Sequence, residues 1–178
     1  TNGIHMPSWL APQMRELYDR HLPSNWVQRS GLPEVWKEIE NISDAELWET
    51  HLALKVQLLD SVRRRIVREA EDRREPVKIV DRLAQSLSPD TLTIGFARRF
   101  ATYKRAGLFL QDPNDLEKLV NDPQRPLQFI FAGKAHPQDE PAKRVLQQIY
   151  EFTRDPRFLG KVVFVEDYDI GLGRRLVQ

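Results

Sequence analysis

The sequence predicts an α/β fold in which a helical first half precedes an open parallel sheet of three strands. Two patterns support this prediction. Residues 44–73 carry apolar side chains at steps of about 3.6 residues, which is typical of a long helix. Further along, three short apolar runs follow one another, at residues 92–96, 128–131 and 162–165. Because helical patterns separate these runs, we expect βαβ units, which place their strands in parallel.

The change of pattern divides the chain into two predicted regions. Residues 1–88 form a helical region, and residues 89–178 form a partial βαβ domain. Three strands are few for a doubly wound sheet, which usually has about five or six. The chain also ends within an apolar helical pattern at residues 176–178. We therefore expect an unfinished sheet within a longer protein.

The helical region contains several separate elements. Residues 9–18 carry one apolar helical stripe, in which Trp9 serves as a core anchor. A loop over residues 23–33 follows, with Trp26 packed down, and a short helix around Trp36 comes next.

The long helix begins at a predicted capping box, in which Ser43 is the N-cap and Glu46 reaches back to it. Its predicted buried positions are Leu47, Leu54, Leu58, Val62 and Ile66. The basic run at residues 63–65 is balanced by nearby acidic residues, so we interpret it as part of a solvated face.

Shorter helices complete the expected order. They cover residues 77–87, residues 108–120 with a break at Asp112 and Pro113, residues 142–153, and a helix that starts near residue 170.

Composition excludes several classes of function. The formal net charge of +1 over 178 residues gives no general signal for nucleic-acid binding. Cysteine is absent and the four histidines are scattered, so the sequence predicts no metal site. No apolar run approaches the roughly 20 residues of a membrane helix. We expect a soluble, cytoplasmic protein with no membrane or nucleic-acid partner.

Positive charge is concentrated directly after the first strand. Arg98, Arg99, Tyr103 and Lys104 follow an apolar run that we interpret as a buried strand. The carboxyl ends of parallel strands bind ligands, and arginine and lysine suit phosphate oxygens. The alternative is an ordinary solvated loop. The position behind a buried strand favours a phosphate site.

The other two strands end at the same edge. Gly133, Lys134 and His136 follow the second strand, and residues 166–168 follow the third. Gly133 would allow the backbone to approach a ligand closely. Glu166 and Asp167 could act as acid or base, although a cap or ion-pair role is the commoner use of such carboxylates. Motifs for nucleotide hydrolysis, dinucleotide binding and serine hydrolysis are absent.

A family resemblance rests on the basic stretch. Residues 96–106, Phe-Ala-Arg-Arg-Phe-Ala-Thr-Tyr-Lys-Arg-Ala, resemble the strand-end motif of the α-glucan phosphorylases, and the bacterial short-form branch most of all. Further matches occur in the family's order at residues 1–4 with 9–10, at 132–135 and at 164–168. The resemblance implies a Rossmann-like sheet that begins the C-terminal domain of a glycosyltransferase fold with two Rossmann-like domains.

The resemblance also implies roles for individual residues. Arg99 and Lys104 would hold the substrate phosphate, with Tyr103 beside them. Arg98, Tyr168 and Trp9 would contact pyridoxal phosphate, and Asn2 would contact the bound sugar. These implied site residues, with those near them, are Asn2, Trp9, Arg98, Arg99, Tyr103, Lys104, Gly133, Lys134, His136 and Tyr168.

The implied activity is phosphorolysis of α-1,4-glucan to glucose 1-phosphate by a homo-oligomeric parent enzyme. The family's cofactor lysine lies in a Gly-x-Met-Lys context, whereas the only methionines here are Met6 and Met14. We therefore expect this chain alone to be inactive. Two alternatives remain open: a nucleotide-sugar glycosyltransferase of the same architecture, and a non-catalytic module that binds anions or RNA.

Overall fold

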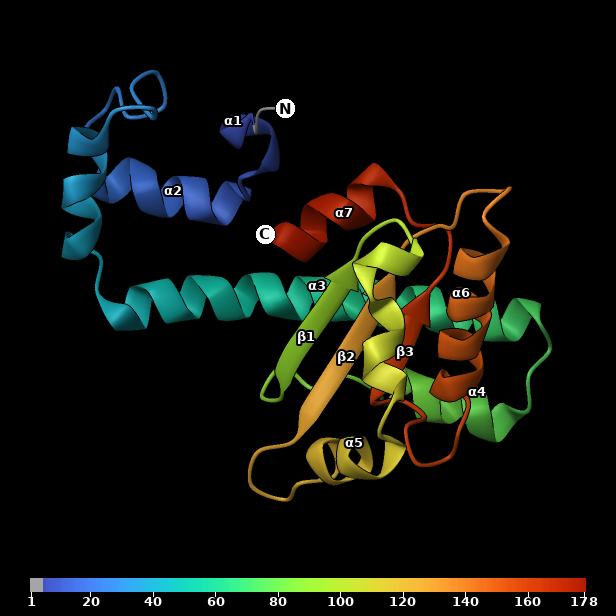
Figure 1. The fold of residues 1–178 in the computed structure, drawn as a ribbon. Coiled ribbons are helices and arrows are strands. Elements are labelled where there is room, and N and C mark those ends of the chain that lie inside the picture. The colour runs from blue at the N-terminus through green and yellow to red at the C-terminus, as the bar shows by residue number, and fades with distance from the viewer. Residues whose placement is uncertain (1–4) are drawn as a thin grey trace. The chain divides into compact units, whose positions relative to one another are not determined.

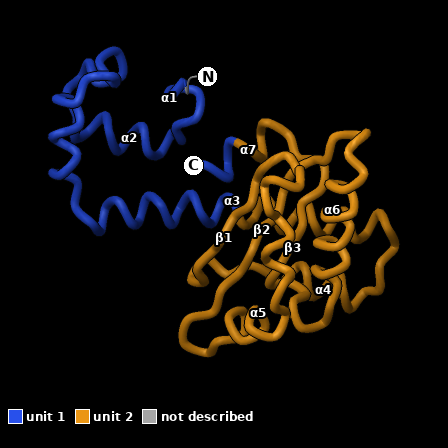
Figure 2. The backbone as a smooth tube through the Cα atoms, in the orientation of Figure 1, with its two compact units in different colours: residues 1–58, 174–178 blue, residues 59–173 orange. Residues whose placement is uncertain are grey.

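The computed structural model describes residues 5–178 (Figure 1). The chain forms two compact units, of which one contains residues 1–58 and 174–178 and the other contains residues 59–173 (Figure 2). These two units are groups of residues that contact one another. The regions predicted from the sequence, residues 1–88 and 89–178, were separated by the type of element instead, and that separation into two regions stays a prediction. The structure is mixed α/β, with helices first and a parallel sheet afterwards, as expected.

The first unit begins with two helices where the sequence analysis expected one. They are α1 (Met6–Trp9) and α2 (Pro12–His21), and Leu10 and Ala11 between them have extended backbones. The prediction of one continuous helical stripe over residues 9–18 was therefore wrong. Proline at position 12 explains the break, because it disfavours helical backbone in the residue before it and suits the first turn of a new helix.

The core of this unit is aromatic. The 3₁₀ helix η1 (Pro33–Asn41) lies beyond the loop that contains Trp26. Trp26 is 1% exposed, and its indole N–H donates a hydrogen bond to Asp19 Oδ1 at 2.7 Å. Tyr18 and Trp36 pack against it edge to face. The prediction that Trp26 packs down is confirmed.

The long helix α3 (Asp44–Asp72) starts at the expected cap, and its first part belongs to this unit. The Ser43 hydroxyl accepts a hydrogen bond from the Glu46 N–H at 3.2 Å. The Glu46 carboxylate instead accepts hydrogen bonds from Arg20 at 2.6 Å and from His21 at 2.8 Å. The hydrogen bond from Arg20 is the largest influence that lowers the pKa of Glu46. The Ser43 part of the predicted capping box is therefore confirmed, whereas Glu46 bonds to side chains of α2 instead of reaching back to Ser43.

The second unit contains the three-stranded sheet. Its strands are β1 (Leu92–Ala97), β2 (Leu127–Ala132) and β3 (Val162–Val165), in the order β1-β2-β3 and all parallel. This confirms the three expected strands within one residue at each end. The central strand β2 is buried along nearly its whole length.

The first strand differs from its prediction as a buried strand. Within residues 5–178, β1 is an edge strand that pairs only with β2. The side chains of Leu92 and Ile94 are 63% and 43% exposed. An apolar run predicts strand formation, but its burial depends on which elements lie beside and above it. The buried-strand argument therefore no longer supports a phosphate site at Arg98 and Arg99, and the site must be argued from its own geometry.

Helices and turns connect the strands. They are α4 (Val77–Ala84), η2 (Thr102–Lys104), η3 (Ala106–Leu110), α5 (Pro113–Val120), α6 (Glu140–Thr153) and α7 (Ile170–Val177), the last of which continues into the first unit. Asp112 caps α5 by accepting a hydrogen bond from the Asp115 N–H at 3.0 Å, which explains the expected break there. Phe129, Phe131 and Phe164 form one face of the sheet and pack in a core with Ile149 of α6.

The basic run of α3 is not simply a solvated face. The Arg63 guanidinium donates hydrogen bonds to the carbonyl oxygens of Ser86 at 2.9 Å and Leu87 at 2.8 Å. Leu87 has a positive φ of 62°. These bonds occupy carbonyl groups of the loop that follows α4. Arg63 is therefore a structural residue, contrary to the interpretation from the sequence.

Candidate functional site

The backbones of β1 and β2 stay together beyond the two strands. Ala97 pairs with Ala132, and a further parallel bridge joins Phe100 to Ala135. The Phe100 N–H donates a hydrogen bond to the Lys134 carbonyl oxygen at 2.9 Å, and the Phe100 side chain is 1% exposed. Arg98 and Arg99 therefore lie between two fixed points, and both side chains are exposed.

Gly133 is required by this close approach of the two chains. Its φ of 152° is uncommon for residues with a side chain. A β-carbon at this position would overlap the carbonyl oxygen of Arg98 and lie 3.0 Å from the Phe100 ring. Sequence analysis expected Gly133 to admit a ligand, whereas in the structure the carbonyl of Arg98 makes the close approach.

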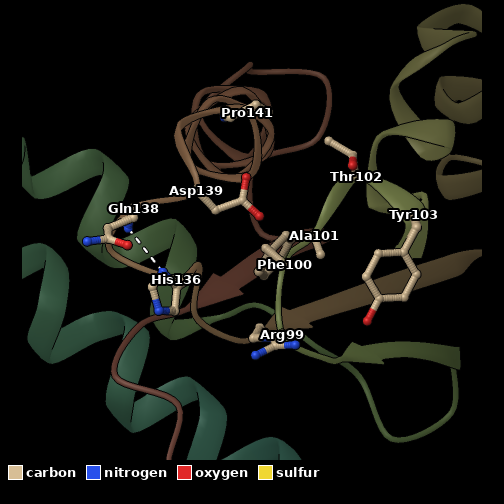
Figure 3. A pocket seen from close by; sticks show the side chains of 9 residues that line it. All are labelled: Arg99, Phe100, Ala101, Thr102, Tyr103, His136, Gln138, Asp139 and Pro141. Atoms are coloured by element: carbon tan, nitrogen blue, oxygen red, sulfur yellow. Dashed lines mark hydrogen bonds between the residues drawn. The ribbon is translucent and has the colours of Figure 1, made fainter.

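A cavity of about 430 Å³ lies beside this strand end (Figure 3). Its lining comes from the segment after β1 and from the segment between β2 and α6. The lining residues are Arg99, Phe100, Ala101, Thr102, Tyr103, His136, Gln138, Asp139 and Pro141. Three of the expected site residues therefore share one cavity: Arg99, Tyr103 and His136.

The N-terminus of α6 contributes to the wall of this cavity. Asp139 is the N-cap and accepts a hydrogen bond from the Ala142 N–H at 3.0 Å. His136 Nδ1 accepts a hydrogen bond from the Gln138 N–H at 3.2 Å, which leaves Nε2 as the protonated ring nitrogen of a neutral imidazole. The positive end of a helix and an arginine favour a bound anion. The Asp139 carboxylate opposes it in part.

Other expected residues lie outside this lining. Lys104 Nζ is 4.8 Å from the centroid of the Tyr103 ring, a cation–π contact, and Tyr103 is 66% exposed. A left-handed residue, Arg105 with φ of 57°, ends the turn that carries both. Arg98 and Lys134 are exposed and do not line the cavity. Five cationic residues thus lie on the two segments that follow β1 and β2. Of these five, only Arg99 lines the cavity. The five are Arg98, Arg99, Lys104, Arg105 and Lys134.

The chain matches curated proteins over its whole length, although no family model matches it. A glycogen phosphorylase of Aquifex aeolicus is 41% identical over 179 residues, which cover 100% of this chain and 26% of that protein. A maltodextrin phosphorylase of Thermococcus litoralis is 42% identical over 177 residues, which cover 99% and 21%. A glycogen phosphorylase of Mycobacterium bovis is 39% identical over 176 residues, which cover 99% and 20%.

The chain is homologous to a segment of the α-glucan phosphorylases. It spans about a quarter or less of the length of these relatives. The resemblance drawn from residues 96–106 and the three further matches is confirmed.

The residues that follow β3 contact α3. Asp167 has a positive φ of 49°, and Glu166 pairs with Arg73. Glu166 is therefore an ion-pair partner, which is the commoner role that the sequence analysis gave to such a carboxylate. Tyr168 lies next to Asp167 and is partly buried.

One expected residue, Trp9, belongs to the other unit. Trp9 is partly buried at the end of α1, and its carbonyl oxygen accepts a hydrogen bond from Gln178 at 3.1 Å. It does not belong to the aromatic core of that unit, so its description as a core anchor was too strong. Asn2 lies outside the described residues.

Sequence analysis missed part of the cavity wall in this segment. Thr102, Gln138, Asp139 and Pro141 line it but were not singled out. The available signal was Asp139, an N-cap residue three positions before the predicted start of the helix at Ala142. Among residues 5–178, no group of three or more His, Asp or Glu side chains could hold a metal ion.

Proposed function

We propose that this chain is part of an α-glucan phosphorylase, which transfers a glucosyl group from α-1,4-glucan to phosphate and releases glucose 1-phosphate. The observation that carries the proposal is the match of the whole chain, at 39–42% identity, to glycogen and maltodextrin phosphorylases. These relatives favour a phosphorylase over a nucleotide-sugar glycosyltransferase.

The module that binds anions or RNA is also disfavoured. The run at residues 63–65 motivated it, together with the arginines after β1. Arg63 and Arg65 donate hydrogen bonds to backbone carbonyl groups of this chain, which leaves less of the run for a partner.

Arg99 and Lys104 are proposed to hold the substrate phosphate. Arg99 lines the cavity beside the N-terminus of α6, and Lys104 lies one turn further along the same segment. A unit charge pair about 4 Å apart interacts by about 4 kcal/mol at an effective dielectric constant near 20. Fixed cations of this kind offset the repulsion between two phosphate groups held close together.

The residues present fit the phosphate group of pyridoxal phosphate. That group needs cations, and the exposed guanidinium of Arg98 at the end of β1 supplies one. We propose Arg98, Tyr168 and Trp9 as cofactor contacts and Asn2 as a sugar contact. When bound, the cofactor phosphate supplies proton transfer to the substrate phosphate. The lysine that carries the cofactor is expected outside these 178 residues.

The remaining expectations concern the cell and the assembly. None of the helices within residues 5–178 has both the length and the apolar character that crossing a membrane requires. We propose a cytoplasmic location and a homo-oligomeric parent enzyme.

The test uses the enzyme that contains this chain, loaded with pyridoxal phosphate. Purified enzyme is incubated with α-1,4-glucan and inorganic phosphate, and glucose 1-phosphate is measured. A parallel reaction offers a nucleotide sugar as donor in place of glucose 1-phosphate for chain elongation. Phosphate-dependent release of glucose 1-phosphate is expected. Elongation from the nucleotide sugar without phosphorolysis would refute the proposal and favour the glycosyltransferase.

A further inference from the structure

Three charged residues at intervals of four converge on the turn that follows β3. Arg65 and Glu69 lie on α3, and Arg73 follows directly after its last residue, Asp72. Residues four apart lie on one face of a helix, so the three side chains form a single row. The turn they contact is residues 166–169, between β3 and α7, and all of these residues belong to the second unit.

Each residue of the row holds a different part of the turn. The Arg65 guanidinium donates hydrogen bonds to the Asp167 carbonyl oxygen at 2.8 Å and to Asp169 Oδ2 at 3.2 Å. Glu69 Oε1 accepts a hydrogen bond from the Glu166 N–H at 3.2 Å. Arg73 donates a hydrogen bond to the Glu166 carboxylate. Backbone groups on both sides of the turn are therefore bound by side chains of one helix.

The turn needs such support because its backbone is unusual. Asp167 has a left-handed backbone, which is unfavourable for a residue with a side chain. Its carbonyl oxygen is the group that Arg65 binds. Asp169 then caps α7 by accepting a hydrogen bond from the Leu172 N–H at 2.7 Å. The row thus stabilises the conformation from which the Tyr168 side chain projects.

The Tyr168 side chain also packs against α7. A β-carbon at residue 173 would lie 2.5 Å from the Tyr168 hydroxyl oxygen and 3.2 Å from the ring carbon that bears it. Gly173 therefore leaves the space that the phenol occupies against α7. A larger residue at position 173 would therefore displace the Tyr168 ring.

We propose that Arg65, Glu69 and Arg73 are positioning residues, which hold the turn at residues 166–169 and thereby fix the position of Tyr168, the proposed cofactor contact. The inference rests on the proposed function, because the cofactor contact of Tyr168 belongs to it. None of the three residues needs to touch cofactor or substrate. They act through the backbone of the turn.

The experiment uses the enzyme that contains this chain and two readouts besides activity. Hydrogen exchange measures the protection of the peptide that covers residues 164–170. The dissociation constant of pyridoxal phosphate is measured by its fluorescence on the cofactor-free enzyme. The variants are Arg65→Ala, Glu69→Ala and Glu69→Gln, with Arg68→Ala as the control, because Arg68 is an exposed arginine on the same helix.

Loss of one backbone hydrogen bond should matter in both readouts. Arg65→Ala and Glu69→Ala are expected to speed exchange in the turn roughly tenfold and to weaken pyridoxal phosphate binding about fivefold. Glu69→Gln keeps an oxygen that accepts the hydrogen bond from Glu166, so it should restore both values to within about twofold of wild type. Arg68→Ala should change neither.

Several results would overturn the inference. Unchanged exchange in both alanine variants would show that the row does not hold the turn. Faster exchange with unchanged cofactor affinity would show that the turn does not orient Tyr168, and the proposed function would stand. A wild-type enzyme that binds no pyridoxal phosphate would refute the proposed function and the inference together. If Glu69→Ala does not fold, Arg65→Lys, which keeps the charge without the planar fork, replaces it in the same comparison.

Discussion

Replacing Glu69 by glutamine should make the stability of this chain less dependent on pH. Burial, and after it the nearby charge of Glu166, raises the pKa of Glu69 from 4.5 to about 7. The Glu166 N–H, Arg73 and Arg65 lower this pKa. Tyr150 of α6 and Arg154, the residue directly after α6, line the same narrow space. The folded chain therefore prefers the protonated carboxyl group more strongly than the unfolded chain does.

The sign and size of the effect follow from this difference. Between about pH 4.5 and 7 the folded chain holds a proton that the unfolded chain has lost, so the free energy of unfolding falls as the pH rises. Unscreened, a pKa rise of this size corresponds to about 3 kcal/mol. The Glu69 side chain is 15% exposed and so remains partly screened by water, and we expect about 2 kcal/mol.

The assay is urea unfolding followed by circular dichroism at pH 5 and pH 8. Glutamine resembles the protonated acid, so Glu69→Gln should match wild type closely at pH 5 and exceed its free energy of unfolding by about 2 kcal/mol at pH 8. Glu71→Gln, an exposed change on the same helix, is the control and should show no such difference between the two pH values. An equal effect of Glu69→Gln at pH 5 and pH 8 would refute the reasoning.

Two further changes test the structure around the cavity. Gly133→Ala would force the segments after β1 and β2 apart at Arg98, so it should lower the free energy of unfolding by roughly 2 kcal/mol or more. The measurement is urea unfolding, and an unfolding midpoint equal to that of wild type would contradict the close approach of the two segments. Asp139→Ala removes the N-cap of α6 and should lower the free energy of unfolding by about 1 kcal/mol. Asp139→Asn keeps an oxygen that accepts the hydrogen bond from the Ala142 N–H, so it should lower that free energy less. Equal decreases in the two variants would argue against the cap.

Local sequence patterns predicted the elements well where a short run of residues decides the outcome. The three strands lie within a residue of their predicted ends, because apolar runs bounded by turns and helices leave few other choices. The break at Asp112 and Pro113 was also visible, since aspartate is a favoured cap and proline suits the first helical turn. The equivalent signal at Pro12 was overlooked.

Features that depend on distant residues could not be predicted from local patterns. The exposure of Leu92 and Ile94 depends on the order of strands in the sheet, not on the strand's own residues. Arg63 was taken for a solvated residue because its carbonyl partners lie more than 20 residues further along the chain.

The candidate site shows both sides of this limit. The sequence analysis predicted that Arg99 and His136 follow parallel strands that end at the same edge of the sheet, and both residues line one cavity. It did not predict that Lys104 stacks on Tyr103, nor that the turn after β3 is held by α3, because side-chain direction and long-range contacts decide these features.

The most direct test of the central claim is the phosphate dependence of phosphorolysis in the enzyme that contains this chain. Arg99→Ala removes a charge-assisted contact worth roughly 1.5–3 kcal/mol, so the KM for phosphate should rise at least about tenfold. Arg125→Ala, an exposed arginine before β2 at the opposite end of the strands, is the matched control and should leave that KM unchanged. An unchanged phosphate KM in Arg99→Ala would contradict a phosphate site at the end of β1.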